Sequence, residues 1–125
     1  MIRPLNDHDA ASMPLTEYGP LKAPTGIPLD GPMTTSGEVF FRHDNGHIVA
    51  GIWEVTPGRM RADFGDDGEM VHVVKGALKA IPDQGEPFTL RPGDTATFEP
   101  HWKGIWELET PMRKLFCVFN FNPTE

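Results

Sequence analysis

The sequence has little cysteine and little positive charge. Its one cysteine, Cys117, cannot form a disulfide within the chain, which excludes a scaffold held by internal disulfides. Cys117 lies in the apolar run 115–119, where we expect a buried and unreactive thiol. Eleven basic residues stand against eighteen acidic ones, which gives a formal net charge of -7. Because nucleic acids and anionic membranes attract basic surfaces, we expect neither as a partner.

Long apolar runs and helical periodicity are also missing. No apolar run approaches the ~20 residues that cross a bilayer, and the N-terminus has no basic-then-apolar signal peptide. We therefore expect a cytoplasmic protein. A length of 125 residues and a hydrophobic fraction of 38% suit one domain with one core.

Glycine and proline are abundant, with thirteen of each. Six of the prolines fall within the first 36 residues, which predicts an extended, irregular arm over residues 1–37. Several apolar side chains in this arm favour packing on the domain or on a partner subunit; a disordered tail is the alternative. Residues 38–125 are expected to form the folded domain.

Short alternating segments separated by turns fill the rest of the chain. Met60, Ala62 and Phe64 alternate with polar residues, and Asp44-Asn45-Gly46 predicts a tight hairpin. The predicted strands cover residues 39–42, 47–55, 59–64, 69–75, 77–81, 87–90, 95–98, 104–109 and 113–121. Their spacing predicts an all-β, antiparallel sandwich or barrel.

Six short motifs carry more information than the alternation. In chain order they are Gly51-Ile52-Trp53-Glu54, Pro57-Gly58-Arg59, the segment from Glu69 to Gly76, Pro92-Gly93-Asp94, Trp102 to Glu107, and Arg113-Lys114. Together they resemble, over residues 48–121, small single-domain cupins of the group related to ureidoglycine aminohydrolase and to an ethanolamine-utilisation cupin. The resemblance implies a jelly-roll barrel, also called a double-stranded β-helix, with the proline-rich arm outside it.

Metal-binding cupins use a His-x-His pair, a following Glu and a later His. On this resemblance, the three imidazole positions fall at Ala62, Phe64 and Ile105, and only Glu69 remains. One carboxylate cannot hold a transition metal tightly, so no metal cofactor is expected. A displaced site that combines Glu69 with His101 or His43 stays open as an alternative.

Glu69 is expected to face the barrel interior. Burial disfavours a carboxylate charge, so Glu69 either holds a proton, as a general acid or base can, or pairs with a basic residue. The candidate partners are Arg59, Arg61, Lys103, Arg113 and Lys114. A buried ion pair without any chemistry is the structural alternative. His72, at odd spacing from Glu69, should point to the opposite face.

A barrel mouth with aromatic, acidic and basic side chains suits a small polar ligand such as a sugar, a ureido compound or an amino compound. The residues predicted to line it are Trp53, Arg59, Phe64, His101, Lys103, Trp106 and Arg113. The sequence therefore predicts a small-molecule-binding cupin, with Glu69 as the acid or base of a metabolic enzyme. The alternatives are a non-catalytic binding or accessory cupin and a metal-dependent, aminohydrolase-like enzyme. Cupins of this size resemble dimers that exchange arms or strands, so we expect a homodimer.

Overall fold

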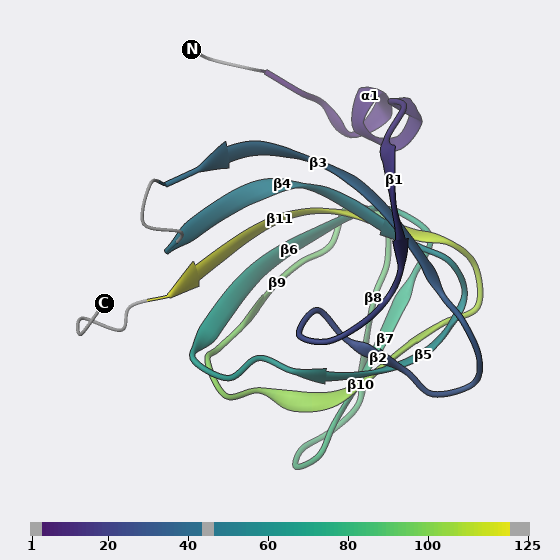
Figure 1. The fold of residues 1–125 in the computed structure, drawn as a ribbon, viewed down its shortest axis with the longest axis vertical. Helices are drawn as coiled ribbons and strands as arrows, with labels where there is room; N and C mark the ends of the chain where they lie inside the picture. Colours follow the sequence, from purple (N-terminus) through teal and green to yellow (C-terminus); the bar gives the residue numbers. More distant parts are fainter. Residues whose placement is uncertain (1–3, 44–46, 121–125) are drawn as a thin grey trace.

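The alternating segments form two facing β-sheets in a computed structural model, which describes residues 4–43 and 47–120 (Figure 1). One sheet has the order β1 (Thr16–Pro20), β3 (Thr34–Arg42), β4 (Ile48–Val55), β11 (Met112–Asn120), β6 (Asp67–Lys75) and β9 (Thr95–Phe98). The other has the order β2 (Ile27–Pro28), β5 (Gly58–Asp63), β10 (Lys103–Leu108), β7 (Leu78–Pro82) and β8 (Phe88–Leu90). Neighbouring strands pair antiparallel. Within the described ranges no ladder joins the two sheets, so the fold is jelly-roll-like and the sheets are not closed into one.

The predicted strands agree closely with the observed ones from β4 onward, and β9 has the predicted bounds. β3 begins at Thr34 rather than at residue 39, because Thr34–Gly37 lacks the apolar alternation by which strands are recognised. The short strands β1 and β2 were not predicted, and both lie at sheet edges. The predicted hairpin at Asp44-Asn45-Gly46 lies outside the described residues.

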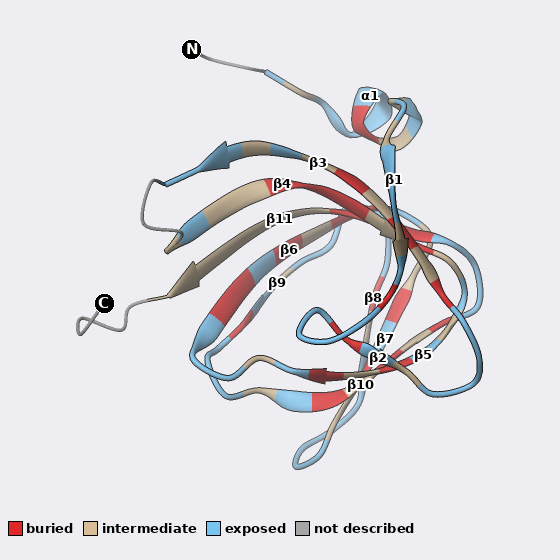
Figure 2. Ribbon diagram, viewed as in Figure 1, coloured by how far each residue is buried: buried red, intermediate tan, exposed pale blue. Residues whose placement is uncertain are grey.

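Side chains alternate between the space enclosed by the two sheets and the outer face of the six-stranded sheet. On β6, Glu69, Val71 and Val73 are buried on the inner side, whereas His72 lies on the outer side, as predicted. The buried stretches occur in strands of both sheets (Figure 2). The inner core consists of Leu21, Met33, Trp53, Val55, Met60, Ala62, Val71, Val73, Leu78, Ala80, Leu90, Phe98, Trp106, Leu108 and Met112.

The N-terminal arm is not extended throughout. Residues Asp7–Ser12 form the helix α1, which the Asn6 side chain caps by accepting a 2.7 Å hydrogen bond from the Asp9 backbone N–H. The sequence has no proline between Pro4 and Pro14, so nothing prevents a turn of helix there. Ala10 of α1 is fully buried against Ile52 and Val74, on the outer face of the six-stranded sheet. No helix in the described part of the chain is long and apolar enough to cross a membrane.

Gly76 and Gly93, which lie where strands pass into turns, adopt positive φ angles. Gly76 has φ 74° and Gly93 has φ 95°, which L-residues with a side chain rarely adopt. A Cβ on Gly76 would also lie 2.2 Å from the Pro111 carbonyl oxygen, whereas one on Gly93 would meet nothing within 4 Å. Glycine at position 76 therefore allows the turn and also allows the backbone at Pro111, just before β11, to approach closely.

Candidate functional site

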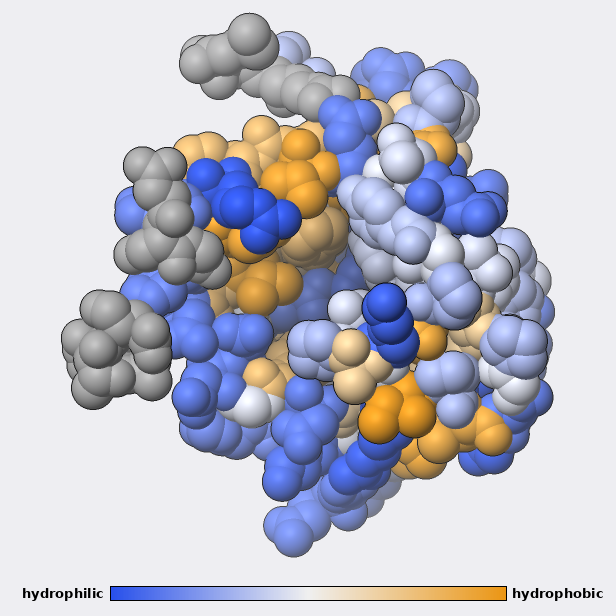
Figure 3. Space-filling view, in the orientation of Figure 1, coloured by the Kyte–Doolittle hydropathy of each residue, from blue (hydrophilic) through white to orange (hydrophobic). Residues whose placement is uncertain are grey.

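A cavity of about 450 Å³ lies between the inner faces of the two sheets and the N-terminal arm. Figure 3 looks onto this side of the molecule, where the surface is hollowed and hydrophobic and hydrophilic residues stand side by side. The lining consists of Tyr18, Pro20, Leu21, Lys22, Pro24, Thr25, Thr35, Trp53, Met60, Ala62, Asp63, Phe64, Asp67, Gly68, Glu69, Trp106, Lys114, Phe116 and Val118. The arm thus supplies one wall of the cavity, in addition to packing on the outside of the domain.

Glu69 and Lys114 form an ion pair in the wall of this cavity. The Lys114 ammonium donates a hydrogen bond to Glu69 Oε2, and the two side chains are only 7% and 10% exposed. Both residues project inward because they alternate with outward-facing neighbours on the adjacent strands β11 and β6. The pair is electrically neutral as a whole, which allows two charged groups to be buried together.

Aromatic rings surround the Lys114 ammonium. Its Nζ lies 4.7 Å from the ring centroid of Trp53, 4.7 Å from that of Trp106 and 5.7 Å from that of Phe116. The faces of aromatic rings attract cations, so these rings and the Glu69 carboxylate together hold the ammonium in place. Lys114 is therefore held as a fixed positive charge at the cavity wall.

The ion pair has hydrogen-bonding capacity left over. Among the described residues, Glu69 Oε1 accepts no hydrogen bond, and Lys114 donates none beyond the one to Glu69. An ammonium has three N–H donors, so two remain. The indole N–H of Trp106 is buried and also has no acceptor in the described part of the chain. The Glu69–Lys114 pair thus keeps one free acceptor and two free donors in the wall of the cavity.

The charges along the lining are unequal. Three carboxylates, those of Asp63, Asp67 and Glu69, face two ammonium groups, those of Lys22 and Lys114. The whole chain is also acidic, with a formal net charge of -7. The electrostatic field of the cavity therefore disfavours a strongly anionic ligand.

Three of the predicted pocket residues, Arg59, Lys103 and His101, lie outside this lining. Arg59 donates hydrogen bonds of 2.8 and 2.9 Å to Asp30, and its guanidinium holds the pKa of that carboxyl below its ordinary value. Lys103 is exposed at the start of β10. The His101 side chain is 71% exposed, and its Nε2 lies 3.8 Å from Asp66. None of the three contacts Glu69.

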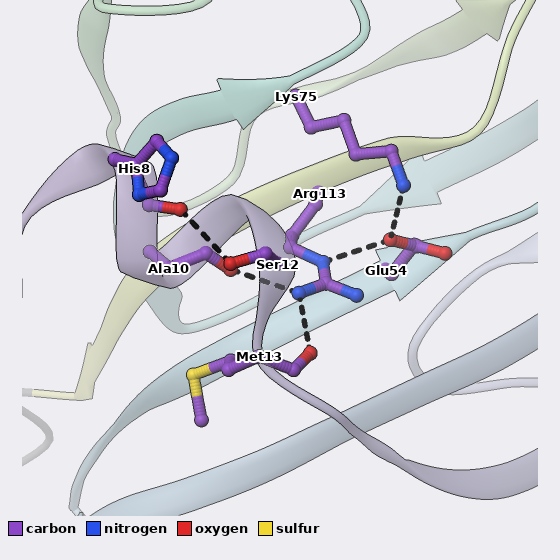
Figure 4. A network of polar contacts seen from close by, with 7 residues as sticks. All are labelled: His8, Ala10, Ser12, Met13, Glu54, Lys75 and Arg113. Carbon is purple, nitrogen blue, oxygen red and sulfur yellow. Dashed lines mark hydrogen bonds and ion pairs between the residues drawn. The ribbon is translucent and has the colours of Figure 1, made fainter.

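Arg113, also predicted to line the pocket, lies on the outer face and holds the arm. Its guanidinium donates 2.8 Å hydrogen bonds to the backbone carbonyls of Ala10 and Met13 and to Glu54 Oε1 (Figure 4). Lys75 reaches the same carboxylate at 3.8 Å. Although Arg113 does not touch the cavity, it fixes the segment that leads into the arm wall.

A second polar contact also fixes the arm. His72 Nε2 lies 3.0 Å from both carboxylate oxygens of Asp7 on α1, and His72 Nδ1 lies 2.9 Å from Thr95 Oγ1. His72 therefore joins the outer face of β6 to the helix.

The residues of the cavity do not fit a transition metal. Ala62 and Phe64 line it with hydrocarbon, and Ile105 lies on the outer side of β10, so that Trp106 takes the inward position. The imidazole position that the cupin resemblance puts at Ile105 therefore lies one residue from the inward Trp106, since β10 presents Gly104, Trp106 and Leu108 inward. No group of three or more histidine, cysteine, aspartate or glutamate side chains in the described ranges is placed to hold a metal. Beside Glu69 lies the ammonium of Lys114, which already supplies a positive charge.

Of the predicted pocket residues, Trp53, Phe64 and Trp106 do line the cavity together with Glu69. Lys114 was one of five candidate partners for Glu69, and the alternation of β11 places it on the opposite face from Arg113. Counting back by twos from the inward Phe116 reaches Lys114 and then Met112, which leaves Arg113 on the outside. The sequence analysis did not predict that the arm lines the cavity, because this depends on how the arm packs against strands far away in sequence.

Comparison with known proteins places these features in a family. A family model described as EutQ-like cupin domain matches residues 42–116, more than half of the chain. No curated protein matches the chain by sequence.

Solved structures show the same fold at low sequence identity. A protein of unknown function from Pseudomonas syringae pv. tomato has a TM-score of 0.73 and 18% identity, over 86% of this chain and 45% of its own. This chain therefore spans less than half of that protein. The EutQ protein of Clostridium difficile has a TM-score of 0.61 and 14% identity, over 72% of this chain and 71% of its own. Ectoine synthase from P. lautus has a TM-score of 0.61 and 20% identity, over 74% of this chain and 67% of its own.

Proposed function

The chain belongs to the EutQ-like cupin domain family, and from this premise we propose that it binds a small polar molecule in its cavity, with Glu69 as proton donor or acceptor. One observation carries the proposal. A neutral pair of acid and base, with unused hydrogen-bonding capacity, lies in the wall of an aromatic cavity. Ligand sites commonly combine an apolar lining with a few polar groups that fix the orientation of the ligand.

The size and lining of the cavity favour compounds of modest size. A volume of about 450 Å³ lies within the ordinary range of small-molecule sites. The rings of Trp53, Phe64, Trp106 and Phe116 can pack on the carbon framework of a ligand, while Glu69 and Lys114 meet its polar groups. Sugars, ureido compounds and amino compounds all have this mixed character.

A metal-dependent, aminohydrolase-like activity is not part of the proposal, because the donor set does not fit a metal. The resemblance to ureidoglycine aminohydrolase enters only through the ureido compounds among the ligands to be tested. A non-catalytic binding protein remains the second candidate. The observation behind it is the direct Glu69–Lys114 contact, because an ion pair that only stabilises the fold would have the same geometry.

Replacement of Glu69 by Gln separates the two candidates. Ligands from the three classes would be screened by quenching of tryptophan fluorescence, because Trp53 and Trp106 line the cavity. Conversion of each bound ligand would then be followed by NMR. For an enzyme, Glu69→Gln retains binding and loses conversion, since Gln keeps the shape of the side chain but cannot carry a proton.

The matched control is Glu99→Gln, which removes the same charge from an exposed residue outside the lining. Binding by both variants without any conversion by the wild type would identify a binding protein. Absence of binding from all three ligand classes would contradict the proposal as a whole.

A further inference from the structure

The contact between Glu69 and Lys114 places a proton acceptor directly beside a positively charged hydrogen-bond donor. Glu69 Oε1 has no donor among the described residues, and two of the three Lys114 N–H groups have no acceptor there. A ligand that meets both groups must offer an oxygen to Lys114 and a hydrogen to Glu69, and these two atoms must be close together.

A carbonyl compound with a hydrogen on the neighbouring carbon has this arrangement. Its carbonyl oxygen accepts from the Lys114 ammonium, and its α-hydrogen lies within reach of the adjacent carboxylate. The Lys114 ammonium is a fixed donor, because the Glu69 carboxylate and the rings of Trp53, Trp106 and Phe116 hold it in place. Fixed donors of this kind stabilise the negative charge that develops on oxygen when an α-proton is removed.

The charges of the site disfavour a ligand with a negative charge. Glu69 and Lys114 balance one another, so an anionic ligand would leave one negative charge uncompensated in a largely buried setting. The carboxylates of Asp63 and Asp67 in the same lining add to this repulsion.

From these observations, and resting on the proposed function above, we propose that the Glu69–Lys114 pair catalyses proton transfer at the carbon next to the carbonyl group of a small carbonyl compound that has no negative charge. Glu69 takes the α-proton and becomes a carboxylic acid. The electron pair of the C–H bond forms the carbon–carbon double bond of an enolate, and the carbonyl π pair moves onto the oxygen, where the Lys114 ammonium stabilises it. Return of a proton from Glu69 to carbon completes the cycle without an oxidant or a cofactor.

Lys114 acts in this scheme through its charge and not as a nucleophile. Formation of an imine needs an amine that is free to attack carbon, but the Lys114 nitrogen donates to the Glu69 carboxylate and lies over the rings of Trp53 and Trp106. Treatment with borohydride in the presence of a carbonyl compound should therefore leave Lys114 without an adduct, as peptide mass mapping can show.

The test is exchange of α-hydrogen for deuterium in D2O, followed by proton NMR. The probes are glycolaldehyde, hydroxyacetone and dihydroxyacetone, with pyruvate as an anionic counterpart. The wild type should accelerate exchange in the neutral probes, and more so than in pyruvate, each relative to its own uncatalysed rate. Glu69→Gln should lower the catalysed rate by roughly 10²–10⁴-fold, the usual contribution of a general base, while Glu99→Gln leaves it unchanged.

Three other results would contradict parts of the proposal. Binding of the neutral probes without exchange, or exchange that survives Glu69→Gln, would overturn the reaction and leave ligand binding intact. Failure of these probes to bind, while a ligand from the wider screen does bind, would overturn the substrate class alone. A borohydride-trapped adduct on Lys114 would overturn the non-covalent role of the amine.

Discussion

Trp53 and Lys114 are cross-strand partners on β4 and β11, and the Lys114 ammonium lies 4.7 Å from the centroid of the Trp53 ring. The next pair along the same ladder, Glu54 and Arg113, points to the opposite face of the sheet. Two consecutive basic residues thus have separate roles: Lys114 carries a charge at the cavity, and Arg113 holds the arm.

The ion pair in the cavity wall should show strong energetic coupling. Lys114→Met leaves the Glu69 charge without its partner, and such a change in a buried pair costs about 3–5 kcal/mol of unfolding free energy. The double variant Glu69→Gln/Lys114→Met buries no charge and should recover most of this loss. Urea unfolding of the four proteins measures the coupling, and a double variant as unstable as the sum of the two single changes would show that the pair is not coupled.

Arg113 should stabilise the arm rather than contact a ligand. Arg113→Ala removes hydrogen bonds to Ala10, Met13 and Glu54, so we expect a loss of about 3 kcal/mol, since bonds to charged groups contribute roughly 1.5–3 kcal/mol each and compensate in part. Hydrogen exchange of residues 7–25 should accelerate more than that of β6. Lys75→Ala is the control, because its exposed side chain reaches Glu54 only at 3.8 Å and should change stability by less than about 1 kcal/mol. Equal protection of the arm in both variants would argue against an anchoring role.

The surface pair of Asp83 and Arg61 predicts a pH dependence of known sign. Arg61 donates hydrogen bonds of 2.6 and 2.5 Å to Asp83 and holds the pKa of that carboxyl below its ordinary value of 3.8. A lowered pKa in the folded state stabilises the fold above the unfolded value and loses that effect as the pH falls through the folded value. The melting temperature of the wild type should therefore exceed that of Asp83→Asn at neutral pH, by a small amount because the pair is exposed.

Melting curves of the two proteins from pH 2 to pH 7 provide the measurement, and the gap between them should close below about pH 4. A gap that widens in acid would have the wrong sign for this pair.

Two positive-φ glycines should differ in their tolerance of alanine. Gly93→Ala meets only the conformational cost of its φ of 95°, about 1–2 kcal/mol. Gly76→Ala has a similar cost and also places a Cβ 2.2 Å from the backbone oxygen of Pro111, so its loss of stability should be at least twice as large. Chemical denaturation of both variants checks the order. Equal losses would mean that β11 moves away from residue 76 without strain.

Metal ions should have no stabilising effect on the cavity. The described residues place one carboxylate beside an ammonium, and Ala62 and Phe64 offer no donor atoms. Addition of Mn²⁺, Ni²⁺ or Zn²⁺, or of a chelator, should therefore leave the melting temperature unchanged. A rise that disappears in Glu69→Gln but persists in Glu99→Gln would reveal metal binding at Glu69.

Much of the fold could be read from local patterns. The alternation Met60–Ala62–Phe64 and the turn glycines Gly76 and Gly93 involve only neighbouring residues, and the structure agrees with both. The β1 and β2 strands in the arm could not be found in this way, because each is defined by pairing at a sheet edge and neither alternates clearly in sequence.

For the cavity, the residue types were predicted better than their arrangement. Glu69, Trp53 and Trp106 were expected to face it and do so, whereas Arg59 pairs with Asp30 in a distant loop. Which base meets a carboxylate depends on the register between strands far apart in sequence, and a slip of one residue reverses the face.

By itself, the sequence determined the all-β class, the family motifs and the inward face of β6, because alternation and turn chemistry act over a few neighbouring residues. The tertiary structure alone decided that Lys114 neutralises Glu69 and that the arm closes one side of the cavity. Both results depend on contacts across dozens of residues, and the free energy of those contacts comes from burial and from charge pairing, which exist only once the sheets and the arm have come together.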